Sequence, residues 1–364
     1  MTEHTPAWYT RLTTILLGLS LAVLILYVGR DVMIPLAYAA LVSVLLSPLV
    51  SFLERHRVPQ LLAITIAVSL ACIGVVALVV VIGMQISQFG EDLPRLKEAG
   101  NLYLARLQAF VTEYLGVTYA EQLRWLEQGL EQAQRNLGGV LGRTFFAFVD
   151  LTSLIILVPL YAFVMLLYAD LLAAFVLRLA SGWQAGIVKA TLLDARKVVN
   201  RYMIGLMMET AIVAVLNTGA LLLLGIDYAV LFGILAAILN LIPYVGILIG
   251  GLLPMIMAII TKDSLWYPLG VVGAFSLVQF IDNNVIVPYV VASRVSINAL
   301  VSILAVIIGG MLWGLSGMFL ALPAVAILKV ACDRIEPLAP WGLLLGDTIP
   351  GRTTDGSKQR PRKT

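Results

Sequence analysis

The polar residues best suited to bind a solute stand together in an apolar part of the chain. Four hydrogen-bonding side chains fall within six residues and are followed by a proline: Gln279, Asp282, Asn283, Asn284 and Pro288. Because unpaired amides and carboxylates are costly in lipid, these side chains either line a polar cavity that binds a solute or ion, or cap a helix end at the membrane edge. The pattern leaves both interpretations open.

Glu209 is an acid in an apolar neighbourhood, beside Met207, Met208 and Ile212. Burial there favours the neutral carboxyl unless water or a partner reaches it, and such a group would suit a proton-coupled step. Asp282 is the second candidate for ion or proton coupling. Alternatively, Glu209 lies near the inner interface, about two helical turns after a group of basic residues, and pairs with one of them.

Enzyme chemistry is not expected from this sequence. Residues 314–317, Gly-Leu-Ser-Gly, match the serine motif of intramembrane rhomboid proteases, but His4 and His56 lie outside the predicted membrane helices. No membrane-embedded base could therefore activate the serine. HExxH, GxGD and P-loop motifs are absent, and Cys72 and Cys332 have no metal-ligand spacing. We expect no catalytic residue, no metal and no cofactor.

The elements that must position these polar residues are membrane helices. With 60% hydrophobic and 12% charged residues, the chain has more apolar surface than one soluble core of 364 residues could bury. Its 21 acidic and 24 basic residues nearly balance, so no broad basic face indicates nucleic acid. We predict an all-α, polytopic integral membrane protein whose partners are the bilayer and a small-molecule or ion substrate, with a homo-oligomer left open.

Apolar runs long enough to cross a bilayer, about 20 residues each, predict about eight transmembrane segments. Lys and Arg follow the second run, follow the fourth and crowd the tail, which places both termini in the cytoplasm of a bacterial inner membrane. The runs are Leu12–Gly29, Val32–Leu53, Val58–Gly90, Leu151–Ala169, Thr210–Ile226, Tyr228–Thr261, Ser264–Ile281 and Val295–Leu328.

The polar stretches between these runs predict six regions. An amphipathic insert outside the membrane contains two helical stripes separated at Gly116, and it would serve as a lid, an oligomer contact or a spacer. The regions are transmembrane helices 1–3 (1–83), this insert (84–145), helix 4 (146–169), a cytoplasmic interfacial region (170–202), a transport core (203–333) and a cytoplasmic, largely disordered tail (334–364).

Two late runs are overlong and interrupted by glycine and proline. Proline removes an amide donor and glycine weakens a helix, so we expect broken helices or re-entrant hairpins rather than straight spans. Non-helical backbone survives at membrane depth only where protein or a water-filled cavity receives its polar groups, which makes these runs candidates for the transport pathway. The first run contains Asn240, Pro243, Tyr244, Gly246, Gly250, Gly251 and Pro254, and the second contains Gly309, Gly310, Gly314, Gly317 and Pro323.

The alternative for both runs is a kinked helix with tight packing. Small residues four apart, Gly246 with Gly250 and Gly310 with Gly314, would let a neighbouring helix approach closely. Asn217, Asn240 and Asn298 are interpreted as residues that hydrogen-bond between helices.

These motifs resemble the autoinducer-2 exporter family of bacterial membrane permeases. The resemblance is sharpest at 242–246 (Ile-Pro-Tyr-Val-Gly), at 279–288, at 309–317 and at 322–323 (Leu-Pro). It implies export or facilitated flux of small molecules, autoinducer-2 in the members that name the group and sodium(lithium)/proton antiport in others. Many relatives carry His-Pro after the Pro288 region, where this chain has Ile297-Asn298-Ala299, so the resemblance implies no role for that histidine here. A non-transporting oligomeric scaffold or channel-like protein is the alternative class.

Overall fold

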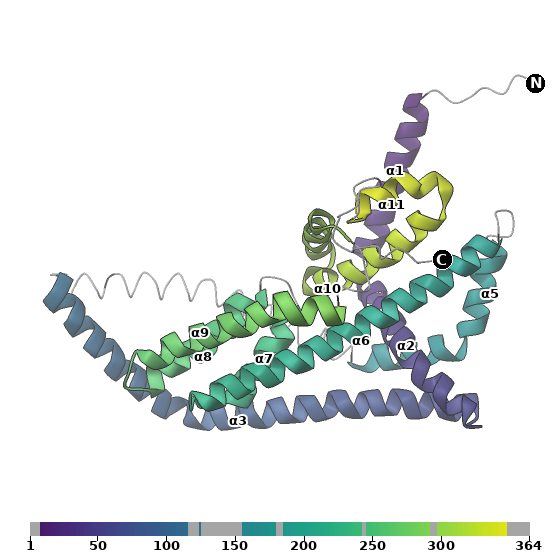
Figure 1. Ribbon diagram of the computed structural model, residues 1–364. Coiled ribbons are helices and arrows are strands. Elements are labelled where there is room, and N and C mark those ends of the chain that lie inside the picture. Colours follow the sequence, from purple (N-terminus) through teal and green to yellow (C-terminus); the bar gives the residue numbers. More distant parts are fainter. Residues whose placement is uncertain are drawn as a thin grey trace, which may run out of the picture.

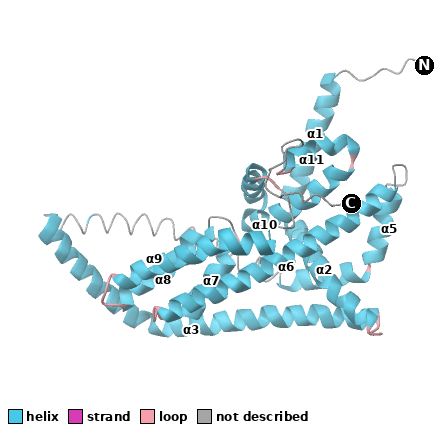
Figure 2. Ribbon diagram, in the orientation of Figure 1, coloured by secondary structure: helices cyan, strands magenta, loops and turns pink. Residues whose placement is uncertain are grey.

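The computed structural model describes residues 8–115, 124, 155–179, 185–241, 245–291 and 297–347. In these residues the chain is helical throughout, apart from loops and one isolated antiparallel bridge between Ile297 and Gly346 (Figure 2). Six of their helices are long and apolar enough to cross a membrane, or seven if a bent pair counts as one span. The predicted all-α, polytopic membrane fold is confirmed, whereas the number of about eight spans is not.

Long apolar segments become helices because a helix satisfies its own backbone hydrogen bonds, which hydrocarbon cannot do. Figure 1 labels most of the elements. They are α1 (Trp8–Val28), α2 (Arg30–Arg55), α3 (Gln60–Leu115), α5 (Ala169–Leu179), α6 (Ala185–Leu223), α7 (Ala229–Asn240), α8 (Val245–Thr261), α9 (Trp266–Ile281), η1 (Asp282–Val291), α10 (Ala299–Arg334), η3 (Glu336–Leu338) and α11 (Ala339–Leu345). A further helix spans Ile155–Leu167.

Two helices extend beyond the packed part of the molecule. No described side chain of α1 is buried, and Figure 1 shows α1 projecting from the other helices. Helix α3 has 56 residues and is about 84 Å long at about 1.5 Å per residue. It therefore continues from the membrane into the first stripe of the predicted insert without a break at residues 83–84. Gly116 and the second stripe lie outside the described residues.

The predicted interfacial region 170–202 consists of two different parts. Helix α5 is bent by 68° from the helix Ile155–Leu167 and buries none of its side chains. Its exposed apolar residues, among them Leu171 and Phe175, stand beside the basic Arg178, an arrangement typical of a helix at the membrane interface. Residues 185–202 instead form the start of the long helix α6, which continues into the membrane.

The overlong run 228–261 folds into a helical hairpin. Helices α7 and α8 are each too short to cross a bilayer, and they flank residues 241–244. They pack so closely that a Cβ on Gly250 would lie 2.9 Å from the Cα of Ala236. Three residues before Ala236 on α7, a Cβ on Gly233 would clash with the backbone of Thr218 in α6. Glycine at these two positions therefore lets α7 pack closely against both α8 and α6.

The second overlong run also reverses direction, although its 36 residues would suffice for a single crossing. Trp313 and Gly314 leave the helical conformation, and Gly314 has φ +60°, which favours glycine. A Cβ on Gly309 would lie 2.8 Å from the carbonyl carbon of Gly317, whereas residues eight apart in a straight helix are about 12 Å apart. Helix α10 is therefore a hairpin whose tip is at residues 313–314.

Candidate solute-binding cavity

Asp282 stands where one helix changes its winding. Helix α9 ends at Ile281, and the π-helical segment η1 begins at Asp282 and contains Pro288. A proline cannot donate the backbone hydrogen bond of a regular helix, and π-helical turns often occur at functional sites. Asp282 lies in an apolar part of the chain and is only 2% exposed, so its carboxylate is buried.

Two amide side chains hold one oxygen of this buried carboxylate. Asn240, at the end of α7, donates from Nδ2 to Asp282 Oδ2 at 3.1 Å, and Gln279 donates from Nε2 to the same oxygen at 3.4 Å. Gln279 Nε2 also lies 3.2 Å from Asn283 Oδ1. The other carboxylate oxygen, Asp282 Oδ1, has no hydrogen-bond partner among the described residues. The break after α7 is thus joined to the α9–η1 junction through this buried carboxylate, which itself is not part of the lining of the neighbouring cavity.

A cavity of about 510 Å³ lies beside this network. Its size falls in the range of about 300–1,000 Å³ that is usual for small-molecule sites. Apolar side chains of α8 and α9, such as Met255 and Phe275, form much of its wall. Its polar lining comes from three helices and η1 and consists of Asn217, Asn240, Ser276, Gln279 and Asn283.

Helix α6 contributes a buried polar face to the same region. Glu209, Val213 and Asn217 are four residues apart and all buried, so they share one face of the helix. Among the described residues, no ion pair joins Glu209 to a basic side chain, so the pairing considered for it is not found there. Asn217 is 4% exposed, and its Oδ1 has no hydrogen-bond partner in the part of the chain that the structure describes.

The tips of the two hairpins pack against one buried cluster. Leu241 follows the end of α7, and Trp313 stands at the tip of α10. Both contact the apolar cluster of Leu41, Val199, Tyr202, Met203, Leu206 and Leu320. Trp313 also donates from Nε1 to the carbonyl oxygen of Leu26 in α1 at 2.9 Å. The α10 hairpin is therefore placed relative to the polar cavity through this shared cluster.

Several residues predicted for the pathway lie elsewhere. Asn284 is exposed and donates to the carbonyl of Phe280 at 2.8 Å, and neither it nor the exposed Pro288 lines the cavity. Gly246 is in the first turn of α8, with its surroundings outside the described residues. Pro243 and Tyr244 lie outside the described residues altogether.

The residues predicted to break or pack the helices have distinct positions. Gly250 contacts α7, Gly251 lines the cavity beside Phe275, and Gly310 lies against Met318. Across the α10 hairpin Gly309 meets the backbone of Gly317 and Gly310 meets Met318, whereas nothing lies within 4 Å of a Cβ on Gly314. Pro254 and Pro323 are both buried inside their helices.

Sequence reasoning missed two cavity residues. Asn217 was interpreted as a residue that hydrogen-bonds between helices, and Ser276 was not considered. The four-residue spacing of Glu209, Val213 and Asn217 is a signal that could have identified Asn217. Ser276 precedes Gln279 by three residues and so shares its helix face.

A larger hollow of about 880 Å³ has a different chemical character. It lies between α6 and α7, with Leu78 of α3 and Phe319 of α10 on its edges, and its surface is almost entirely apolar. Such a surface suits lipid chains rather than a polar solute. The smaller cavity beside Asp282 is therefore the candidate site.

The model of the AI-2E transporter family matches residues 15–336. The chain belongs to this family. AI-2E family members resembling it include the AI-2 transport protein TqsA of Escherichia coli, 23% identical over 88% of this chain and 90% of that protein. YhhT of the same organism, named as a candidate transport protein, is 27% identical over 93% of this chain and 95% of that protein. YrrI of Bacillus subtilis, named in the same way, is 25% identical over 83% of this chain and 86% of that protein.

Membership confirms the family resemblance seen in the sequence motifs. This AI-2E protein is a multi-pass membrane transporter, whose partners are the bilayer and a transported substrate. Gln279, Phe280 and Asn283 of the motif at 279–288 line the cavity, and the motif at 309–317 contains the tip of the α10 hairpin.

Proposed function

We propose that this protein is a secondary transporter that passes a small polar solute through the cavity beside Asp282. The observation that carries the proposal is the buried carboxylate with one oxygen held by Asn240 and Gln279 and the other unpartnered. A buried polar group without a partner costs about 1–3 kcal/mol, and a solute or ion that supplies a donor or a positive charge would remove that cost. The glycine- and proline-broken helices at this point also fit a transporter's central site.

For the substrate we propose autoinducer-2, moved outward across the inner membrane. The cavity is lined by amide and hydroxyl groups, which offer both hydrogen-bond donors and acceptors to a small hydroxylated molecule. TqsA, named as an AI-2 transport protein, aligns over 88% of the chain. At 23% identity this relative supports the substrate class without deciding the substrate.

Flux through proteoliposomes tests the site with two neighbouring amides. Both side chains are exposed, but Asn283 lines the cavity and accepts from Gln279, whereas Asn284 lies outside the lining and donates to the carbonyl of Phe280. We expect Asn283→Ala to lower autoinducer-2 flux about tenfold, equivalent to about 1.4 kcal/mol, and Asn284→Ala to leave it near wild type. Equal effects of the two substitutions, with equal insertion, would place the pathway elsewhere.

A sodium(lithium)/proton antiporter is the second candidate, favoured by the free Asp282 Oδ1 and by the nearby Glu209. An unpaired carboxylate oxygen can coordinate a cation or hold a proton. The prediction is that a sodium jump drives proton movement in proteoliposomes and that Asp282→Asn abolishes it. A pH-sensitive dye inside the vesicles measures this movement, and no response from the wild-type protein would eliminate the antiporter.

A further inference from the structure

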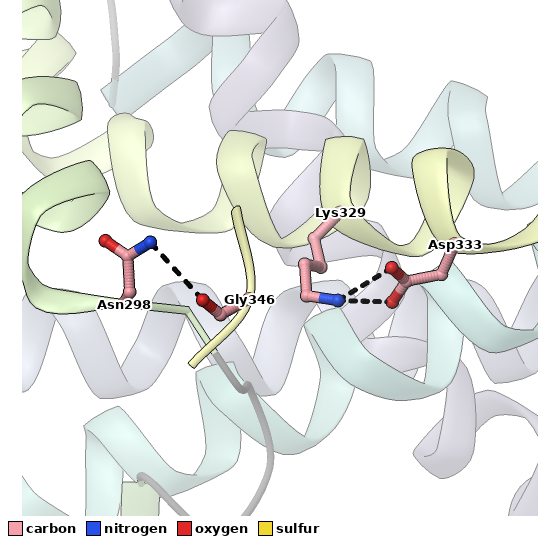
Figure 3. A network of polar contacts seen from close by, with 4 residues as sticks. All are labelled: Asn298, Lys329, Asp333 and Gly346. Carbon is pink, nitrogen blue, oxygen red and sulfur yellow. Dashed lines mark hydrogen bonds and ion pairs between the residues drawn. The ribbon is translucent and has the colours of Figure 1, made fainter. Parts of the chain in front are cut away.

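The open end of the α10 hairpin is closed by the C-terminal part of the chain. Because the helix reverses at 313–314, its first residues and its last turns lie near each other, as Figure 3 shows for Asn298 and Lys329. Residues 335–347, here called the C-terminal clasp, follow α10 and include α11. Ile297 and Gly346 form an antiparallel bridge. The backbone N–H of Asn298 donates to the backbone carbonyl of Leu345 at 3.1 Å.

The Asn298 side chain uses both ends of its amide. Its Oδ1 accepts from the backbone N–H of Val301 at 2.8 Å and so caps the first turn of α10. Its Nδ2 donates to the carbonyls of Leu344 at 2.6 Å and Gly346 at 3.3 Å, the latter drawn in Figure 3. One side chain therefore joins the start of the hairpin to the end of the clasp.

The clasp also rests on the second half of the hairpin. Gly346 lies beside Lys329, whose Nζ contacts the two carboxylate oxygens of Asp333 at 2.7 and 2.5 Å (Figure 3). A Cβ on Gly342 would meet Oδ1 of the same Asp333. Arg334 then pairs with Asp194, which connects this end of the hairpin to α6.

We propose that Asn298 is a positioning residue for transport, because it fastens the clasp across the base of the α10 hairpin. Holding the base of the hairpin fixes where its tip lies. The tip residue Trp313 packs against the same cluster as Leu241. Leu241 directly follows Asn240, which donates a hydrogen bond to Asp282. The clasp thus acts on the cavity through the hairpin, and Asn298 contacts no cavity residue itself. This effect on flux rests on the proposed transport function, whereas the clasp contacts do not.

Three substitutions separate the capping role of Asn298 from its clasp role. Asp keeps the acceptor for Val301 but has no donor for the carbonyls of the clasp, and Ala has neither. Neutral His offers one acceptor and one donor and so can replace both contacts. If Asn298 only caps α10, Asn298→Asp behaves like the wild type. If it fastens the clasp, Asn298→Asp resembles Asn298→Ala, and Asn298→His recovers.

Hydrogen exchange on the purified full-length variants is the first readout. We expect residues 297–301 and 342–347 to exchange at least tenfold faster in Asn298→Ala, equivalent to about 1.4 kcal/mol. In Asn298→Asp, only 342–347 should exchange faster, and Asn298→His should restore protection. Wild-type protection of 342–347 in Asn298→Asp would overturn the proposal, and this result does not depend on the substrate.

Autoinducer-2 flux in proteoliposomes is the second readout. We expect Asn298→Ala and Asn298→Asp to lower the maximal rate several-fold with little change in half-saturation, because the cavity residues are untouched, and Asn298→His to recover. Deleting residues 336–364 should reproduce the loss, whereas deleting only 348–364, which leaves the clasp, should not. Faster exchange of the clasp with unchanged flux would overturn the positioning role, and wild-type protein without flux would instead refute the proposed function.

Discussion

At the residue scale, the two oxygens of Asp282 are in different situations. Oδ2 accepts from Asn240 and Gln279, and these contacts hold the carboxylate in place. Oδ1 is buried and has no hydrogen-bond partner among the residues that the structure describes. Since an unpaired buried polar atom lowers stability, its presence in a natural protein calls for a functional reason. Asn217, which lines the cavity from α6, presents the same feature, because its Oδ1 is also unpaired among the described residues.

Asn217 allows a test in which stability and function respond in opposite directions. We predict that Asn217→Leu raises thermal stability in detergent, because an apolar side chain of similar size removes a desolvation cost of about 1–3 kcal/mol. The same substitution should lower flux, because the cavity loses a polar group. Thermal unfolding and proteoliposome flux measure the two effects.

The matched control is Val213→Leu, one turn away on the same buried face of α6. This substitution changes the size of the side chain without removing a polar atom. We therefore expect Val213→Leu not to raise thermal stability. A less stable Asn217→Leu protein would mean that the amide is satisfied in the folded state and does not serve a solute.

At the element scale, the two hairpins depend on close backbone contact. Across α10, Gly309 and Gly317 touch through their backbones, and no side chain would fit between them. Between α7 and α8, Gly250 has the same role against Ala236. Such contacts are stable in lipid because small residues let helices approach and gain dispersion energy.

Gly317→Ala tests the α10 hairpin. The added methyl would collide with the Gly309 backbone, which cannot move aside as a flexible side chain can. We predict a loss of about 1–3 kcal/mol of stability, the usual cost of overpacking, together with reduced flux. Thermal unfolding in detergent measures the first effect.

Gly273→Ala provides the comparison, since nothing lies within 4 Å of a Cβ built on Gly273. Its stability should equal or slightly exceed that of the wild type, because alanine favours a helix. If Gly317→Ala were as stable as Gly273→Ala, the two halves of α10 would not pack as described.

At the scale of the whole molecule, the distribution of charge predicts which side each loop faces. The turn containing His56 is flanked by Arg55 and Arg57, whereas the turn at 225–227 has only the acidic Asp227. Because Lys and Arg are retained on the cytoplasmic side, we propose that the first turn lies in the cytoplasm and the second outside.

Thiol labelling of intact cells checks this topology. In a variant with Cys72 and Cys332 replaced by Ala, we expect Asp227→Cys to react with a membrane-impermeant maleimide and His56→Cys to react only after permeabilisation. Both positions are exposed, so access to solvent is comparable. Labelling of both positions from outside would refute cytoplasmic termini.

The sequence by itself determined the class of this protein and the places where its helices break. Lipid leaves each backbone group to be satisfied within its own segment, so apolar runs must be helices. Glycine and proline mark where such a helix is weakest, although Pro254 and Pro323 stay inside their helices. The hairpin positions at 241–244 and 313–314 and the polar cluster at 279–283 could therefore be read locally. The family motifs, too, are local strings of residues.

Only the tertiary structure decided which of these residues meet. Asn217 lines the cavity and Asn284 does not. Gly309 contacts Gly317 of the same hairpin rather than a separate helix. The direction of a side chain on a membrane helix depends on how that helix rotates against its neighbours, and apolar residues surround nearly every face of these helices, so periodicity carries little information. Packing between distant segments supplied what the local pattern lacked.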